Sequence, residues 1–63
     1  MWTLRSRSGA RAATCDVRRH PLGLELMVEI DGDPYFTQVH RDVASLDDEA
    51  EALKSRLLSR GWA

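Results

Sequence analysis

The chain has 63 residues, of which 30% are charged, and its net charge is −1. A chain of this length forms at most one domain and buries only about 60% of the surface that it exposes when unfolded. Its single cysteine, Cys15, excludes an intrachain disulfide, and one cysteine with two histidines does not complete a four-ligand zinc site. We therefore expect the chain to self-associate and so to gain stability that its small core does not supply.

Residues 1–12 are predicted to form a mobile basic segment, followed by a single domain over residues 13–63. Residues 5–12 have no hydrophobic periodicity and are rich in arginine, which is typical of a segment with little to bury. Residues 1–19 have a net charge of +4, whereas residues 20–63 have a net charge of −5. The alternative is that Trp2 and Leu4 add a short strand, with both side chains on one face.

Alternating side chains predict the first two strands, over residues 13–18 and residues 24–30. In residues 24–30 every second side chain is aliphatic and most of the others are polar, which is typical of a half-buried strand. Pro21 keeps His20 out of the helical region, and Gly23 supplies a permissive backbone. A turn is therefore expected between the two strands.

Asp31-Gly32 predicts a β-hairpin turn, because both residues tolerate positive φ. The third strand is expected over residues 35–41. A two-residue turn brings Val28 opposite Tyr35 and places three side chains of this strand on the core side: Tyr35, Thr37 and Val39.

Two other loop lengths change this register. A four-residue loop keeps the same side chains on the core side, because the slip is even. A three-residue loop turns the strand over and buries Phe36, Gln38 and His40, which is less favourable because two of them are polar. Pro34 has no backbone N–H, so it leaves the register of this hairpin open.

A helix is predicted from residue 43 to a stop at Gly61. Apolar residues recur at spacings of three and four along it, namely Val43, Leu46, Ala50, Leu53 and Leu57. Asp42 is the expected N-cap, with Ser45 as a rival. Gly61 is expected at the C′ position of a Schellman motif, with Trp62 folded back onto the end of the helix.

These elements predict an α+β fold of order β-β-β-α, a three-stranded antiparallel sheet with the C-terminal helix packed on one face. The expected core combines the aliphatic face of the sheet with the apolar stripe of the helix: Cys15, Val17, Leu24, Leu26, Val28, Ile30, Tyr35, Val39, Val43, Leu46, Ala50, Leu53, Leu57 and Trp62.

We predict no enzymatic activity, no catalytic residues, and no cofactor or metal site. Cys15 with His20 or His40 is the only conceivable pair of nucleophile and base, and Cys15 falls on the core side of its strand. The spacing of Cys15, His20, His40 and Asp42 matches no metal-ligand signature.

The outer face of the sheet is the predicted interaction surface. The two-residue turn makes Met27 and Phe36 cross-strand neighbours on that face, with His40 beside them. An aromatic and a thioether side chain exposed together suggest a contact patch, and open sheet edges offer a second route by strand addition. We therefore expect a non-enzymatic interaction module that binds itself, as a homodimer, or another protein.

Nucleic-acid binding is the alternative function. The order β-β-β-α resembles the arm-type DNA-binding domains of tyrosine recombinases, in which a three-stranded sheet enters a groove. The basic residues available for it are Arg5, Arg7, Arg11, Arg18, Arg19 and Arg41. Glu25 and Glu29 lie on the face that would meet phosphate and disfavour this function.

The layout of residues 15–62 also resembles that of a group of short bacterial proteins. The shared positions read H-P-x-G-x-E-L over residues 20–26, D-G at 31–32, V-x-R at 39–41 and G-W at 61–62. The resemblance implies a small fold of sheet and helix without an assigned activity. The sequence shows no signal peptide and no membrane-spanning run, so a cytoplasmic location is expected.

Overall fold

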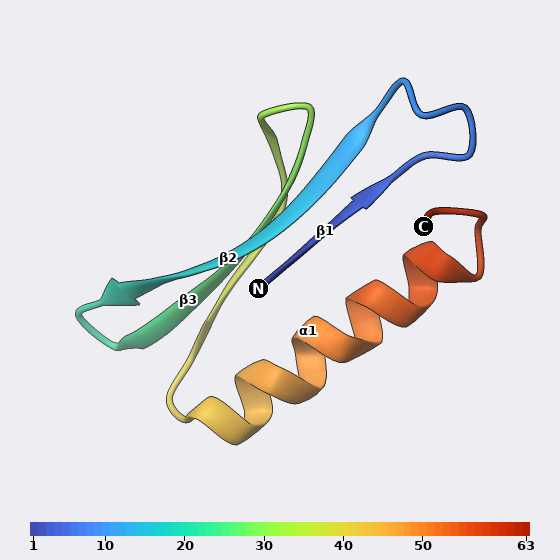
Figure 1. The fold of residues 1–63 in the computed structure, drawn as a ribbon. Coiled ribbons are helices and arrows are strands. Elements are labelled where there is room, and N and C mark those ends of the chain that lie inside the picture. The colour runs from blue at the N-terminus through green and yellow to red at the C-terminus, as the bar shows by residue number, and fades with distance from the viewer.

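The computed structural model describes all 63 residues and consists of four strands followed by one helix (Figure 1). The strands are β1 (Trp2–Arg5), β2 (Ala12–His20), β3 (Gly23–Ile30) and β4 (Asp33–His40), and the helix is α1 (Val43–Leu58). Each strand pairs antiparallel with the next, so the sheet order is β1-β2-β3-β4. The helix lies along one side of this twisted sheet.

The predicted α+β class and the helix packed on an antiparallel sheet are confirmed, but the sheet has four strands instead of three. The additional strand, β1, falls within the segment that we expected to be mobile. Trp2 pairs with Cys15 and Leu4 pairs with Ala13, so both β1 side chains share the helix side of the sheet. The indole Nε1 of Trp2 donates a hydrogen bond to the Ala50 carbonyl at 3.2 Å. These contacts come from distant parts of the chain, which explains why residues 1–12 show no local pattern.

The hairpin between β3 and β4 has the two-residue turn that the sequence predicts. Ile30 faces Asp33 across the turn, and Asp31 and Gly32 have φ values of 54° and 85°. Positive φ at both central residues matches the twist of the flanking strands.

Beyond the turn, a β-bulge changes the face that β4 presents. Pro34 faces Glu29, but the next pair is Phe36 with Val28, so Tyr35 is the extra residue. The bulge places three side chains on the helix side in the register that we considered less favourable: Phe36, Gln38 and His40. The predicted inward position of Tyr35, Thr37 and Val39 is therefore wrong.

Both ends of the helix follow the prediction. The Asp42 side chain accepts a hydrogen bond from the Ser45 backbone N–H at 2.8 Å. At the other end, Trp62 N–H donates to the Leu57 carbonyl and Gly61 N–H donates to the Leu58 carbonyl, at 3.1 Å each. With φ of 96° at Gly61, these two bonds form a Schellman motif.

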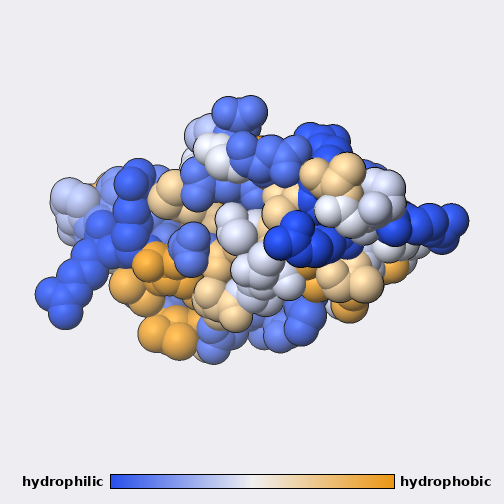
Figure 2. Space-filling view, turned by 45° about the horizontal axis from the view of Figure 1, so that its top comes forward, coloured by the Kyte–Doolittle hydropathy of each residue, from blue (hydrophilic) through white to orange (hydrophobic).

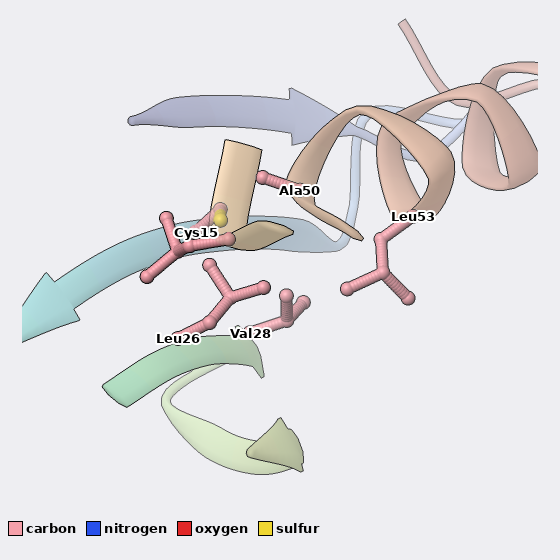
Figure 3. Packing of buried hydrophobic residues seen from close by; sticks show 6 residues of the cluster. Cys15, Leu26, Val28, Ala50 and Leu53 are labelled. Carbon is pink, nitrogen blue, oxygen red and sulfur yellow. The ribbon is translucent and has the colours of Figure 1, made fainter. Parts of the chain in front are cut away.

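The core is a row of buried side chains between the helix and the sheet (Figure 3). The buried residues are Leu4, Ala13, Cys15, Leu26, Val28, Leu46, Ala50, Leu53 and Leu57. Three residues predicted in the core are exposed instead: Val17 at 37%, Tyr35 at 53% and Val43 at 58%. Val17 lies on the helix side of β2 in a part of the sheet that the single helix leaves uncovered, Tyr35 is the extra residue of the bulge, and Val43 begins the first turn of the helix.

Candidate interaction surfaces

The structure does not bring the predicted contact residues together on the outer face. Met27 faces Thr37 on that side of the sheet. Phe36 instead faces Val28 and packs against the core from the helix side. His40 lies on the helix side too, where its Nδ1 is 3.2 Å from Ser45 Oγ. The predicted pair of Met27 and Phe36 is therefore not formed, because the bulge at Tyr35 puts Phe36 on the opposite face of the sheet from Met27.

The outer face of the sheet is mixed in character rather than apolar. Arg18 and Glu25 form an ion pair across β2 and β3, and Glu25, Met27 and Glu29 are each half-buried. The view in Figure 2 shows hydrophobic residues in small, separate groups among hydrophilic ones. The ion pair of Glu25, the carboxylate of Glu29 and the inward position of Phe36 leave the outer face without the predicted apolar pair, so the sheet edges become the stronger candidates.

The edge formed by β4 is long and carries no charge along most of its length. From Pro34 to Val39 the strand has aromatic, β-branched and amide side chains and no lysine, arginine or carboxylate. Charged side chains are a common device that keeps edge strands from pairing with other chains. This edge has only Pro34 and the bulge, and both lie near its first residues.

The backbone of β4 also points bonding groups away from the sheet. Backbone groups along an antiparallel strand alternate between its two neighbours, and Asp31 N–H donates to Ala12 O on the β2 side. The even-numbered residues of β3 consequently turn toward β4, where they pair with Phe36, Gln38 and His40. Thr37 and Val39 therefore direct their N–H and C=O groups outward, and Thr37 is exposed.

The opposite edge, β1, is largely closed. The strand has four residues, and Arg5 exchanges two backbone hydrogen bonds with Ala63, at 2.7 Å and 2.9 Å. Backbone groups alternate along β1 as well, so those of Thr3 and Arg5 point away from β2. Arg5 is bonded to Ala63, which leaves Thr3 as the one residue of β1 with outward backbone groups and no backbone partner. The sheet thus has one closed edge and one open edge.

The six arginines proposed for nucleic-acid contact are divided among different parts of the molecule. Arg11 binds Asp31 and Arg18 binds Glu25, while Arg19 lies on the helix side of β2. Arg41 lies in the connection between β4 and α1. Arg5, Arg7 and Arg11 lie at one end of the sheet, and Arg18, Arg19 and Arg41 lie at the other, where Arg19 faces Leu24 and Leu24 faces His40.

Cys15 is buried in the core, with 1% of its surface exposed. Burial raises the pKa of its thiol; the Met1 amino group opposes this shift in part, and Asp16 adds to it. A raised pKa keeps the thiol protonated, whereas the thiolate is the reactive form. Neither histidine is hydrogen-bonded to Cys15, and no group of three or more histidine, cysteine or carboxylate side chains is placed to hold a metal ion.

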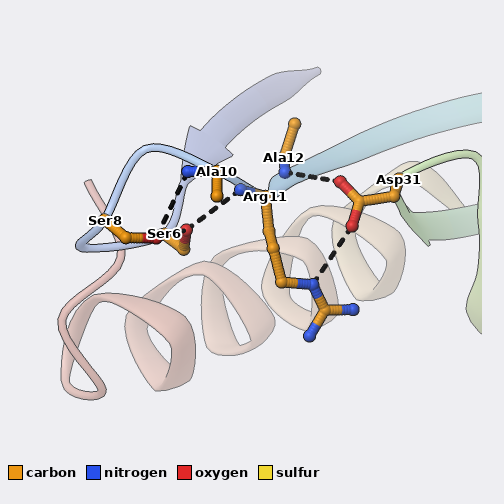
Figure 4. Close-up of polar contacts among 6 residues, drawn as sticks. All are labelled: Ser6, Ser8, Ala10, Arg11, Ala12 and Asp31. Carbon is orange, nitrogen blue, oxygen red and sulfur yellow. Dashed lines mark hydrogen bonds and ion pairs between the residues drawn. The ribbon is translucent and has the colours of Figure 1, made fainter.

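Asp31 ties the hairpin turn to the start of β2 (Figure 4). Its carboxylate accepts hydrogen bonds from Ala12 N–H at 2.9 Å and from Arg11 Nε at 3.1 Å. The Ala12 bond, followed by the Arg11 bond, lowers the pKa of Asp31 below its ordinary value of 3.8. The neighbouring loop is ordered by its own serines, since Arg11 N–H donates to Ser6 Oγ at 3.1 Å.

We expect this carboxylate to make part of the stability dependent on pH. A lowered folded-state pKa means that its contribution is present above pH 3.8 and is lost as the pH falls through the lower, folded value. Asp31→Asn keeps a residue that tolerates positive φ but removes the charge. Urea unfolding at several pH values between neutral and strongly acidic should therefore show a smaller acid-induced loss for this variant than for the wild type.

Asp33→Asn is the control for this measurement, because Asp33 is exposed and forms no ion pair. The pH dependence of this control should match that of the wild type. Equal pH dependence in the wild type and Asp31→Asn would contradict the role given to the Asp31 carboxylate.

Comparison with known proteins found no matching family model, no matching curated protein and no matching solved structure. The surface has no pocket. The 16 residues of α1 are too short and too polar for a membrane-crossing helix.

Proposed function

We propose that the protein is a non-enzymatic interaction module that forms a homodimer by antiparallel pairing of β4 with β4 of a second copy. The contrast between the two sheet edges carries this proposal. β1 is short and bonded to Ala63, whereas β4 is uncharged from Pro34 to Val39 and directs the backbone groups of Thr37 and Val39 outward. An open edge of this kind is a template for another strand.

A second copy is the partner that fits this edge best. A two-fold axis places the same edge on both sides of the interface, so one open strand satisfies the other. Because the strand is uncharged, no like charges meet across the pairing. The small core supports the same partner: only 9 of 63 residues are buried, and small domains commonly gain stability from oligomerisation.

The outward backbone groups suggest a register for the pairing. An axis at Gln38 places Thr37 opposite Val39 of the second copy, and each such pair exchanges both of its hydrogen bonds. This register leaves the bulge at Tyr35 outside the central pairs. It also joins the two sheets into one continuous sheet with both helices on the same face.

The substitution Thr37→Pro tests the pairing directly. Proline removes an N–H group that points away from β3, a position that edge strands tolerate. A dimer of the variant lacks one such donor in each copy and so loses two hydrogen bonds. At about 1 kcal/mol per bond, the dissociation constant of the dimer should rise about thirtyfold. Sedimentation equilibrium at micromolar concentrations measures the change, and Thr37→Lys tests the same site while retaining the N–H group.

Thr3→Pro is the matched control, since Thr3 is an exposed threonine whose backbone points outward from the other edge. It should leave the dimer intact, and circular dichroism should show folded protein for each variant. A monomeric wild type, or equal effects of the Thr37 and Thr3 substitutions, would refute the proposal.

A further inference from the structure

One end of the molecule gathers arginines from two parts of the chain that are far apart in sequence. The loop between β1 and β2 meets the last turn of α1 at this end (Figure 1). The backbone bonds between Arg5 and Ala63 join the two parts. The Arg7 guanidinium lies over Gly61, where an added Cβ would be 3.3 Å from its Nε and Nη2 atoms.

We call this region the basic end and define it by four exposed side chains: Arg5, Arg7, Arg56 and Arg60. Arg56 lies in the last turn of α1, and Arg60 lies two residues after its end, next to Gly61. Neither forms an ion pair, and neither do Arg5 and Arg7, because the two salt bridges of the molecule involve Arg11 and Arg18.

The negative groups at this end are too few to cancel its charge. Asp31 is already bonded to Arg11. Ala63 accepts a hydrogen bond from Arg5 N–H, and its α-carboxylate adds one negative charge. The carbonyl end of α1 contributes about half a negative charge more. The four arginines outweigh these two contributions together, so the region remains electropositive although the whole chain has a net charge of −1.

We infer that the basic end binds the phosphate backbone of a nucleic-acid duplex. Guanidinium groups match phosphate oxygens with two parallel hydrogen bonds, and contacts to the backbone are the main source of affinity that does not depend on sequence. Single strands are commonly held by exposed aromatic rings. The one exposed aromatic residue, Tyr35, belongs to β4, so the duplex backbone is the better match.

This surface is independent of the strand pairing proposed above. The basic end includes β1 and the end of α1, whereas the pairing uses β4 at the opposite edge of the sheet. A failure of one proposal therefore does not entail a failure of the other, provided that the oligomeric state of each variant is measured.

The test is binding of the full chain to a short fluorescein-labelled DNA duplex of mixed sequence, followed by fluorescence anisotropy. Four phosphate contacts predict that affinity falls about 150-fold between about 50 and 200 mM salt, since each contact contributes a logarithmic slope of about −0.9. Replacing Arg7 and Arg60 together by glutamate should weaken binding at the lower salt concentration by tenfold or more. A second double variant avoids Arg7, whose replacement could disturb the contact with Gly61. Replacing Arg56 and Arg60 together by glutamate should weaken binding by a similar factor.

The matched control replaces Arg19 and Arg41 together by glutamate. Both are exposed and form no ion pair, and the change in net charge is the same. Binding by this control should stay within twofold of the wild type. Equal weakening by both pairs, no binding to the duplex, or binding only to phosphatidylserine vesicles would overturn the inference.

Discussion

Replacing Leu26 by alanine is expected to remove about half of the free energy of unfolding. Leu26 is fully buried in the middle of β3 and belongs to the cluster that joins the sheet to the helix. Substitutions of buried leucine by alanine cost about 2–5 kcal/mol, because they remove apolar contacts and leave a cavity. A domain of this length has a total stability of about 3–9 kcal/mol at ordinary values per residue.

Urea unfolding followed by the fluorescence of Trp2 and Trp62 measures this loss. Both indoles are half-buried and lie against the core. The control is Val43→Ala, since Val43 is 58% exposed and surface substitutions usually change stability by less than about 0.5 kcal/mol. All variants need the same protein concentration, because a dimer adds a concentration-dependent term. Equal losses for both would show that Leu26 is not central to the core.

Gly23→Ala is expected to be the most damaging glycine substitution. A Cβ at Gly23 would lie 2.3 Å from the backbone oxygen of His40, and the φ of Gly23 is 145°. A clash with backbone cannot be relieved by a change of side-chain conformation. Overpacking of about 1–3 kcal/mol therefore adds to the cost of about 1–2 kcal/mol for a left-handed conformation.

Gly32→Ala separates these two costs. Gly32 also has a positive φ, of 85°, but nothing lies within 4 Å of the position of its added Cβ. Only the conformational cost applies there, so Gly32→Ala should be less destabilising than Gly23→Ala in the same urea experiment. Similar losses for both variants would mean that β4 moves aside without cost.

The sequence pattern was sufficient for the elements whose signals are local. The alternation in residues 24–30, the turn at Asp31-Gly32, the Asp42 cap and the Gly61 stop all appear in the structure. Each depends on residues only a few positions apart. The helix stripe also held for Leu46, Ala50, Leu53 and Leu57, but not for Val43 at the first turn.

The register of β4 was not predictable in the same way. Each face of residues 35–40 combines one aromatic residue with polar side chains, and the alternation favours the face of Tyr35, Thr37 and Val39, which is not the one that the structure buries. The extra residue at Tyr35 exchanges the two faces of the strand. In this register Phe36 packs against the core. Similarly, β1 depends on contacts with Ala50 and Ala63, from distant positions in the chain.

The sequence predicts a sheet edge as one route for association and names Arg5 and Arg7, but it does not predict which edge is open or which other residues lie beside these arginines. The uncharged run from Pro34 to Val39 is visible in the sequence, but its position at an open edge follows only from the sheet order. Arg56 and Arg60 have ordinary places at the end of a helix. Their proximity to Arg5 and Arg7 arises from the backbone bonds between Arg5 and Ala63.

The order in which the strands pair also has a consequence for how the chain folds. Each strand bonds to its neighbour in sequence, so most of the structure forms by closing short loops, which favours rapid folding. The bonds between Arg5 and Ala63 are different, because they join the two ends of the chain. Their closure carries the largest loop entropy in the molecule, so we expect this junction between β1 and Ala63 to form last and to open first, while β1 stays paired with β2.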